Sequence, residues 1–135
     1  MIQQARNIFA ADRYATDTTG ISIDHVADHE AVCSLTVGAL HCNARGVAMG
    51  GTLFTLADFA AAIAANTDCI ADGNLHWVSL DSAIHYLSPA PLGILLKATA
   101  QAVKQGRTTA LYQTTIERPD NGHKIALVET TMIFV

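Results

Sequence analysis

One carboxylate stands alone in the most apolar stretch of this sequence. Asp58 is the only charged residue between Met49 and Thr67, and helical spacing places Phe54 and Ala62 beside it. Removing an unpaired carboxylate from water costs several kcal/mol unless a partner compensates it. Asp58 therefore bonds a buried backbone group, faces an interface, or acts as a catalytic base or nucleophile. Its position alone leaves these interpretations open.

Small and polar residues precede this stretch. Gly50, Gly51 and Thr52 stand where a helix could start, and unpaired N–H groups at a helix start can point at an oxyanion. Glycine lets a ligand approach the backbone closely, although a Gly-Gly pair equally makes a tight entry turn. Asn43 could donate its side-chain amide to a carbonyl oxygen, or it could only shape the loop before Gly46.

The other reactive side chains form no recognisable motif. The histidines do not form the H-E-x-x-H motif of zinc enzymes, and no metal site is predicted; they are His25, His29, His41, His76, His85 and His123. Three cysteines without C-x-x-C indicate neither a disulfide framework nor a thiolate zinc site, and they fit a reduced, cytoplasmic setting. No G-x-S-x-G segment is present, so a triad hydrolase is not supported.

The elements that must position these residues follow from hydrophobic periodicity. The stretch with Asp58 is alanine-rich and apolar on nearly every side, so a sheet should cover this helix all round. Helices and strands that are segregated along the chain favour the α+β class over an alternating α/β sheet. The expected elements are a docking helix over 2–14 with Ile2, Ala5, Phe9 and Arg13 on one face, strands over 21–26 and 31–37, the buried helix over 53–66, and strands over 77–87, 92–104, 107–118 and 124–135, with hairpin turns at 105–106 and 119–122.

Composition favours one oligomeric domain over residues 1–135. The hydrophobic fraction of 50%, with only 15% charged residues, is high for a small monomer, so part of the apolar surface is expected to cover a subunit interface. A net charge of −4 with scattered basic residues makes nucleic acid an unexpected partner. We expect no membrane span, because the most apolar run, 52–66, is too short and contains Asp58, and no signal peptide is evident.

The polar residues described above occur in an order that resembles a known active-site segment. The order is Asn43-x-x-Gly46-x-x-Met49-Gly50-Gly51-x-x-x-x-Leu56-Ala57-Asp58. It is similar to the pattern Asn, Gly, His-Gly-Gly, then Leu-Ala-Asp of the PaaI-like hotdog-fold acyl-CoA thioesterases. The similarity covers nearly the whole chain, because it continues through Val78–Asp81, His85–Ala90, Gly93 and Lys104–Thr108.

The resemblance implies the hotdog fold, in which a curled antiparallel sheet wraps the long helix and two protomers pair their sheets edge to edge. The active site would then lie between subunits of a homodimer or a dimer of dimers, that is, a homotetramer. Asp58 would attack the thioester or activate water, and the Gly50 N–H would hold the thioester oxygen. Asn43 would polarise the carbonyl, and Ser79 would position water or the carboxylate. The substrate would be an acyl-coenzyme A, with no metal or redox cofactor.

One residue departs from the family pattern: Met49 stands where the family has His. The methionine side chain cannot donate a hydrogen bond. It either makes soft apolar contact with an acyl or aromatic group of the substrate or only fills a gap. Gly51 would also line the substrate site. Lys104 and Arg107 would meet coenzyme A phosphates or would belong to an ordinary solvated hairpin.

The departure at Met49 keeps other functions open. A hotdog protein that binds acyl-CoA or another apolar ligand without hydrolysis is the main alternative. A hydratase ranks lowest, because it needs a His near the helix start and none lies between Cys42 and Leu75.

Overall fold

The alternating segments of the chain join into one antiparallel sheet. The computed structural model describes residues 1–135, and the strand order in the sheet is β1-β2-β4-β5-β6-β3. The strands are β1 (Ser22–Ala27), β2 (Glu30–Thr36), β3 (Trp77–Tyr86), β4 (Leu95–Gln105), β5 (Thr109–Glu117) and β6 (Lys124–Phe134). Both predicted hairpin turns are confirmed, since β4 pairs with β5 and β5 with β6. The strand expected from Leu92 begins only at Leu95, because Gly93 turns the backbone with a φ of 91°.

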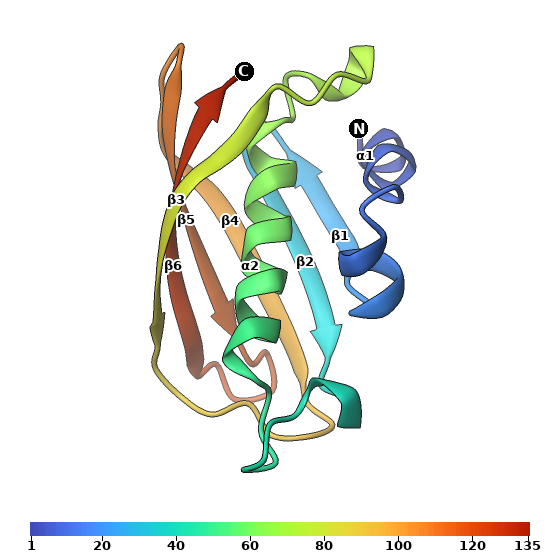
Figure 1. Cartoon of the computed structure of the whole chain (residues 1–135), viewed down its shortest axis with the longest axis vertical. Helices are drawn as coiled ribbons and strands as arrows, with labels where there is room; N and C mark the ends of the chain where they lie inside the picture. The colour runs from blue at the N-terminus through green and yellow to red at the C-terminus, as the bar shows by residue number, and fades with distance from the viewer.

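The apolar run forms helix α2 (Gly50–Ala65), which lies against the curled sheet and contacts all six strands (Figure 1). This arrangement confirms the predicted α+β hotdog fold. Contrary to the prediction, the sheet does not cover α2 on every side. A stripe along α2 stays partly exposed because the sheet curls around only part of the helix; its residues are Gly51, Thr55, Asp58 and Ala62. No helix of the structure combines the length and apolar character needed to cross a membrane.

The N-terminal helix docks as predicted but ends early. Helix α1 (Ile2–Phe9) buries Ala5 and Phe9, and the Phe9 ring packs edge-on against Phe59 of α2 with centroids 5.8 Å apart. The prediction that Arg13 shares this face was wrong, because the helix ends at Phe9. Arg13 is exposed and pairs with Asp17 at 2.7 Å, next to a π-helical turn over Tyr14–Thr18. Two short 3-10 helices complete the chain, Ala39–His41 and Ile70–Asp72.

Strand β3 forms a free edge of the sheet. It pairs only with β6, and of its ten residues only Trp77 is buried. Several of its exposed side chains are large and apolar: Val78 is 44% exposed, Leu80 59% and Tyr86 55%. A long, apolar edge strand with free backbone groups is a template for pairing with another chain.

Candidate functional site

Asp58 lies in the middle of α2 and faces the first part of β3. Ser79 Oγ donates a hydrogen bond to Asp58 Oδ1 at 3.1 Å. The β3–β6 register shifts between Ser79 and Asp81, so a bulge follows the residue that holds the carboxylate. We call Asp58 and Ser79 the carboxylate half-site.

The surroundings of Asp58 strengthen it as a base. Partial burial raises the pKa of Asp58, the hydrogen bond from Ser79 lowers it, and the negative charge of Asp12 raises it, with burial the largest effect. The carboxylate also faces a small pocket of about 240 Å³, which Asp12 and Tyr14 line from the segment after α1. A carboxylate with a raised pKa that remains open to a pocket is suited to accept a proton.

The start of α2 presents unpaired backbone donors. Met49 precedes the helix with an extended backbone, at φ −63° and ψ 143°, and no side chain caps the helix end. Thr52 N–H and Leu53 N–H both donate to Met49 O, whereas the Gly50 and Gly51 N–H groups make no backbone hydrogen bond. These two amides are therefore free to bind a negatively charged oxygen at the positive end of the helix.

A pocket of about 390 Å³ opens beside Gly50. Asn43 and Tyr86 line it together with Gly50, and Leu53 contributes an apolar wall. The Tyr86 hydroxyl lies so close to the glycine that a Cβ added at Gly50 would be 2.8 Å from it. Sequence reasoning missed Tyr86; the only signal was its place in the segment His85–Ala90 that shares the family resemblance. We call Gly50, Asn43 and Tyr86 the amide half-site.

Asn43 shapes its loop and lines the pocket beside Gly50. Its Oδ1 accepts hydrogen bonds from Arg45 N–H at 2.9 Å and Val47 N–H at 3.4 Å, so the side chain shapes the loop. The side-chain NH₂ group makes no hydrogen bond within the chain, and Asn43 is one of the residues that line the pocket beside Gly50.

The four predicted substrate-binding residues lie in two separate places. Met49 is half exposed at the start of α2, and its side chain reaches over Gly51. Lys104 and Arg107 are exposed at the β4–β5 turn, near the opposite end of α2 (Figure 1). Within one chain the structure does not bring these two pairs together.

The two half-sites are also apart within one chain. Gly50 and Asp58 are eight residues apart on α2, which corresponds to about 12 Å along the helix axis at about 1.5 Å per residue. A donor and a base that act on one carbonyl group must both lie within about 3–3.5 Å of the reacting atoms. One chain therefore cannot bring the Gly50 amide and the Asp58 carboxylate to the same carbonyl group.

Comparison with known proteins identifies the family. Residues 45–124 match the family model described as Thioesterase superfamily. The chain belongs to the thioesterase superfamily. It is 36% identical over 110 residues to the acyl-coenzyme A thioesterase PaaI of Escherichia coli, covering 82% of this chain and 74% of that protein. A putative esterase of Caenorhabditis elegans is 31% identical over 110 residues, but the match spans only 63% of that protein's length.

Solved structures of similar proteins superpose closely on this chain. The E. coli PaaI protein from the phenylacetic acid degradation operon superposes with a TM-score of 0.81 at 30% identity, over 97% of this chain and 95% of that one. A hypothetical thioesterase of Streptococcus pneumoniae, solved with coenzyme A, gives a TM-score of 0.81 at 26% identity, over 94% and 96% of the two chains. The predicted PaaI-like hotdog family is confirmed.

Proposed function

We propose that this thioesterase hydrolyses an acyl-coenzyme A thioester to a free acid and coenzyme A, with Asp58 as base or nucleophile and the Gly50 amide as oxyanion donor. The observation that carries the proposal is the half-buried Asp58 carboxylate, whose pKa is raised and which Ser79 holds at a pocket. The substrate class is supported by the E. coli relative, which is named an acyl-coenzyme A thioesterase, and by the S. pneumoniae protein, which was solved with coenzyme A.

The chemistry follows from these groups. As a base, Asp58 takes a proton from water while the water oxygen bonds to the carbonyl carbon, and the carbonyl oxygen becomes negative. The Gly50 N–H and the Asn43 amide stabilise that oxygen, which is worth a few kcal/mol at a helix start. The C–S bond then breaks, and the sulfur of coenzyme A takes the proton. As a nucleophile, Asp58 would bond to the carbonyl carbon while the C–S bond breaks, so that coenzyme A leaves as a thiolate and an anhydride remains on Asp58. Water would then hydrolyse the anhydride, which releases the free acid, returns the Asp58 carboxylate and supplies the proton for the thiolate.

The two half-sites would meet across a dimer. In an antiparallel pairing of two β3 edges, the start of one strand lies beside the end of the other. Ser79 is near the start of β3, where it holds Asp58, and Tyr86 is at its end, against Gly50. Edge pairing would therefore bring the carboxylate half-site of one protomer to the amide half-site of its partner, and it would cover the apolar side chains of β3.

The remaining predicted residues fit around such a composite site. Lys104 and Arg107 belong to the β4–β5 turn, and Thr108 O of this turn accepts a hydrogen bond from Phe134 N–H, next to the start of β3. Neither basic residue forms an ion pair, so both could bind coenzyme A phosphates near the carboxylate half-site. Met49 and Gly51 would contact the acyl side. The proposed hydrolysis uses no metal or redox cofactor. The three free thiols suit a reduced, cytoplasmic setting. Pairing of the β3 edges makes the proposed assembly a homodimer or a homotetramer.

One observation favours a second candidate function. Met49 is half exposed at the mouth of the amide half-site and offers no hydrogen-bond donor. A site that lacks this donor could bind an acyl-CoA or another apolar ligand without hydrolysing it.

The deciding experiment measures free-thiol release from short, medium, long and aromatic acyl-CoAs. The native protein, Asp58→Asn and Met49→His are compared, with Asp24→Asn as a control at an exposed aspartate outside both half-sites. We expect the native protein to hydrolyse some members of the panel and Asp58→Asn to lose about two orders of magnitude, as removal of a general base should. A native protein that is inert on every thioester, while Met49→His gains turnover, would replace hydrolysis by binding.

A further inference from the structure

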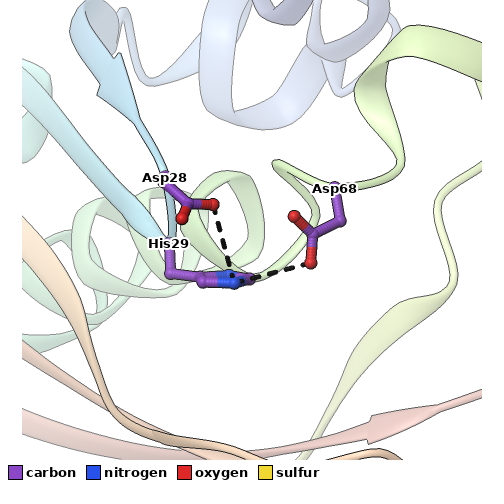
Figure 2. Close-up of side chains that lie close together, drawn as sticks. All are labelled: Asp28, His29 and Asp68. Atoms are coloured by element: carbon purple, nitrogen blue, oxygen red, sulfur yellow. Dashed lines mark ion pairs between the residues drawn. The ribbon is translucent and has the colours of Figure 1, made fainter.

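Two carboxylates flank one imidazole at the far end of α2 from Gly50 (Figure 2). Asp28 and His29 form the two-residue turn between β1 and β2, and Asp68 follows the end of α2. His29 Nε2 lies 3.6 Å from Asp28 Oδ1 and 3.5 Å from Asp68 Oδ2. The three side chains can each direct one ligand atom to a common point, because these atoms lie within 4.8 Å of one another. We call these residues the Asp-His-Asp cluster.

A hydrogen-bond chain from the core fixes the orientation of this imidazole. The side chain of Tyr112 is fully buried, and its hydroxyl donates to Gln105 Oε1 at 2.7 Å. The Tyr112 oxygen also lies 3.2 Å from His29 Nδ1 and can accept a hydrogen bond from this nitrogen. In the tautomer that makes this hydrogen bond, Nε2 faces the two carboxylates with its lone pair. An outer partner on one ring nitrogen, with the other nitrogen free, is the usual arrangement of a metal-binding histidine.

A lone pair that faces two negative charges is unfavourable unless a positive charge lies between them. Protonation of Nε2 would supply one, but hydrogen bonds between charged groups are about 2.7–2.9 Å long, whereas both distances here are 3.5 Å or more. Two ligands of one tetrahedral zinc ion, each about 2.0–2.1 Å from it, are about 3.3–3.4 Å apart. The spacing of Nε2 from both carboxylates matches shared coordination better than direct pairing.

We propose that Asp28, His29 and Asp68 bind one divalent transition-metal ion, with Zn²⁺ as the preferred occupant and water completing its coordination. One imidazole and two carboxylates suit zinc, whereas Mg²⁺ and Ca²⁺ favour oxygen ligands alone. The aspartate side chains are exposed, so small rotations can bring their oxygens to the ion. Motif spacing could not reveal this cluster, because its members come from two segments that only the fold brings together.

The backbone around the cluster is already held in place. His29 N–H donates to Thr67 Oγ1 at 3.0 Å, and His29 O accepts from Ala102 N–H at 3.2 Å. The β1–β2 turn is thus tied both to the end of α2 and to β4. A bound ion would add a link between the turn and Asp68 and would stabilise this end of the molecule.

The test is a titration of the metal-free native protein with Zn²⁺, followed by calorimetry and by the midpoint of thermal unfolding. We expect saturable binding of one ion per chain and an unfolding midpoint that rises with zinc concentration, but no comparable effect of Mg²⁺. Co²⁺ serves as a spectroscopic probe. Its bands should be those of nitrogen and oxygen ligands, without the thiolate charge-transfer band that binding at Cys42 would produce.

Three variants separate this site from non-specific binding. Asp68→Asn should weaken zinc binding at least tenfold, whereas Asp24→Asn, which removes the same charge elsewhere, should not. His29→Asn removes the nitrogen ligand and keeps the fold, because asparagine tolerates the positive φ of 53° at this position. Tyr112→Phe keeps the buried ring but removes the outer hydrogen bond, and we expect about a tenfold loss of affinity.

Two outcomes would overturn the proposal. One is the absence of saturable zinc binding to the native protein. The other is zinc binding that Asp68→Asn and His29→Asn leave unchanged.

Discussion

Substitution of Gly50 by alanine tests the geometry of the amide half-site. The new Cβ would lie 2.8 Å from the Tyr86 hydroxyl, 2.9 Å from Cζ and 3.2 Å from Cε1. Contacts below about 3.0 Å force atoms apart, so either the ring or the start of α2 must move. At the neighbouring Gly51, an added Cβ would meet only the flexible end of Met49, at 3.0 Å. Gly51→Ala is therefore the matched control for the effect on stability.

The expected magnitude follows from two opposing effects. Overpacking of this kind costs about 1–3 kcal/mol, and alanine gains up to about 1 kcal/mol over glycine in a helix. Gly51→Ala should keep most of that gain, whereas Gly50→Ala should lose it and more. In the double variant with Tyr86→Ala the clash disappears, so the two substitutions should couple by about 1–3 kcal/mol.

Two assays measure the effect of these substitutions on stability and on activity. Urea unfolding at a fixed protein concentration gives the free energies for the cycle, and thiol release gives kcat/KM. Alanine keeps the Gly50 N–H, yet the displaced Tyr86 and the new methyl group reduce the pocket of about 390 Å³. We expect kcat/KM to fall about tenfold, which corresponds to about 1.4 kcal/mol. Equal unfolding free energies of Gly50→Ala and Gly51→Ala, with no coupling of Tyr86→Ala to either, would refute the predicted clash.

Three further predictions concern Asp58 and the composite site. Because burial raises the pKa of Asp58, the acid limb of the pH profile of kcat/KM should lie above the ordinary aspartate range. Ser79→Ala removes a hydrogen bond that lowers this pKa, so it should move the acid limb to still higher pH. If the limb stays unchanged in Ser79→Ala, titration of Asp58 does not set it. A carboxylate with a raised folded-state pKa makes the protein less stable as pH rises through that pKa, so at neutral pH Asp58→Asn should unfold at a higher temperature than the native protein. Mixed dimers of Asp58→Asn with Asn43→Ala subunits, isolated by two affinity tags, contain one intact composite site and should recover about half of the native activity, whereas sites confined to one chain would recover none.

The sequence predicted the fold well because its patterns are local. Alternating residues predicted six strands within a few residues of their bounds, and the alanine-rich run predicted α2. The start of α2 at Gly50 instead of Leu53, and the early end of α1 at Phe9, are helix-end effects that periodicity does not determine. The incomplete cover of α2 was not predictable, because it depends on how far the sheet curls.

The sequence by itself determined which groups could do chemistry. The residue types and their spacing show a lone carboxylate in an apolar run and a Gly-Gly pair at a helix start. Both occur at the positions that the sequence pattern of a thioesterase family expects. Only the tertiary structure decided how these groups are arranged. It joins Ser79 to Asp58, sets Tyr86 against Gly50, and brings Asp28 and His29 to Asp68. The physical reason is that these contacts link segments distant along the chain, and such contacts depend on strand register, a bulge and the curl of the sheet, which no local pattern encodes.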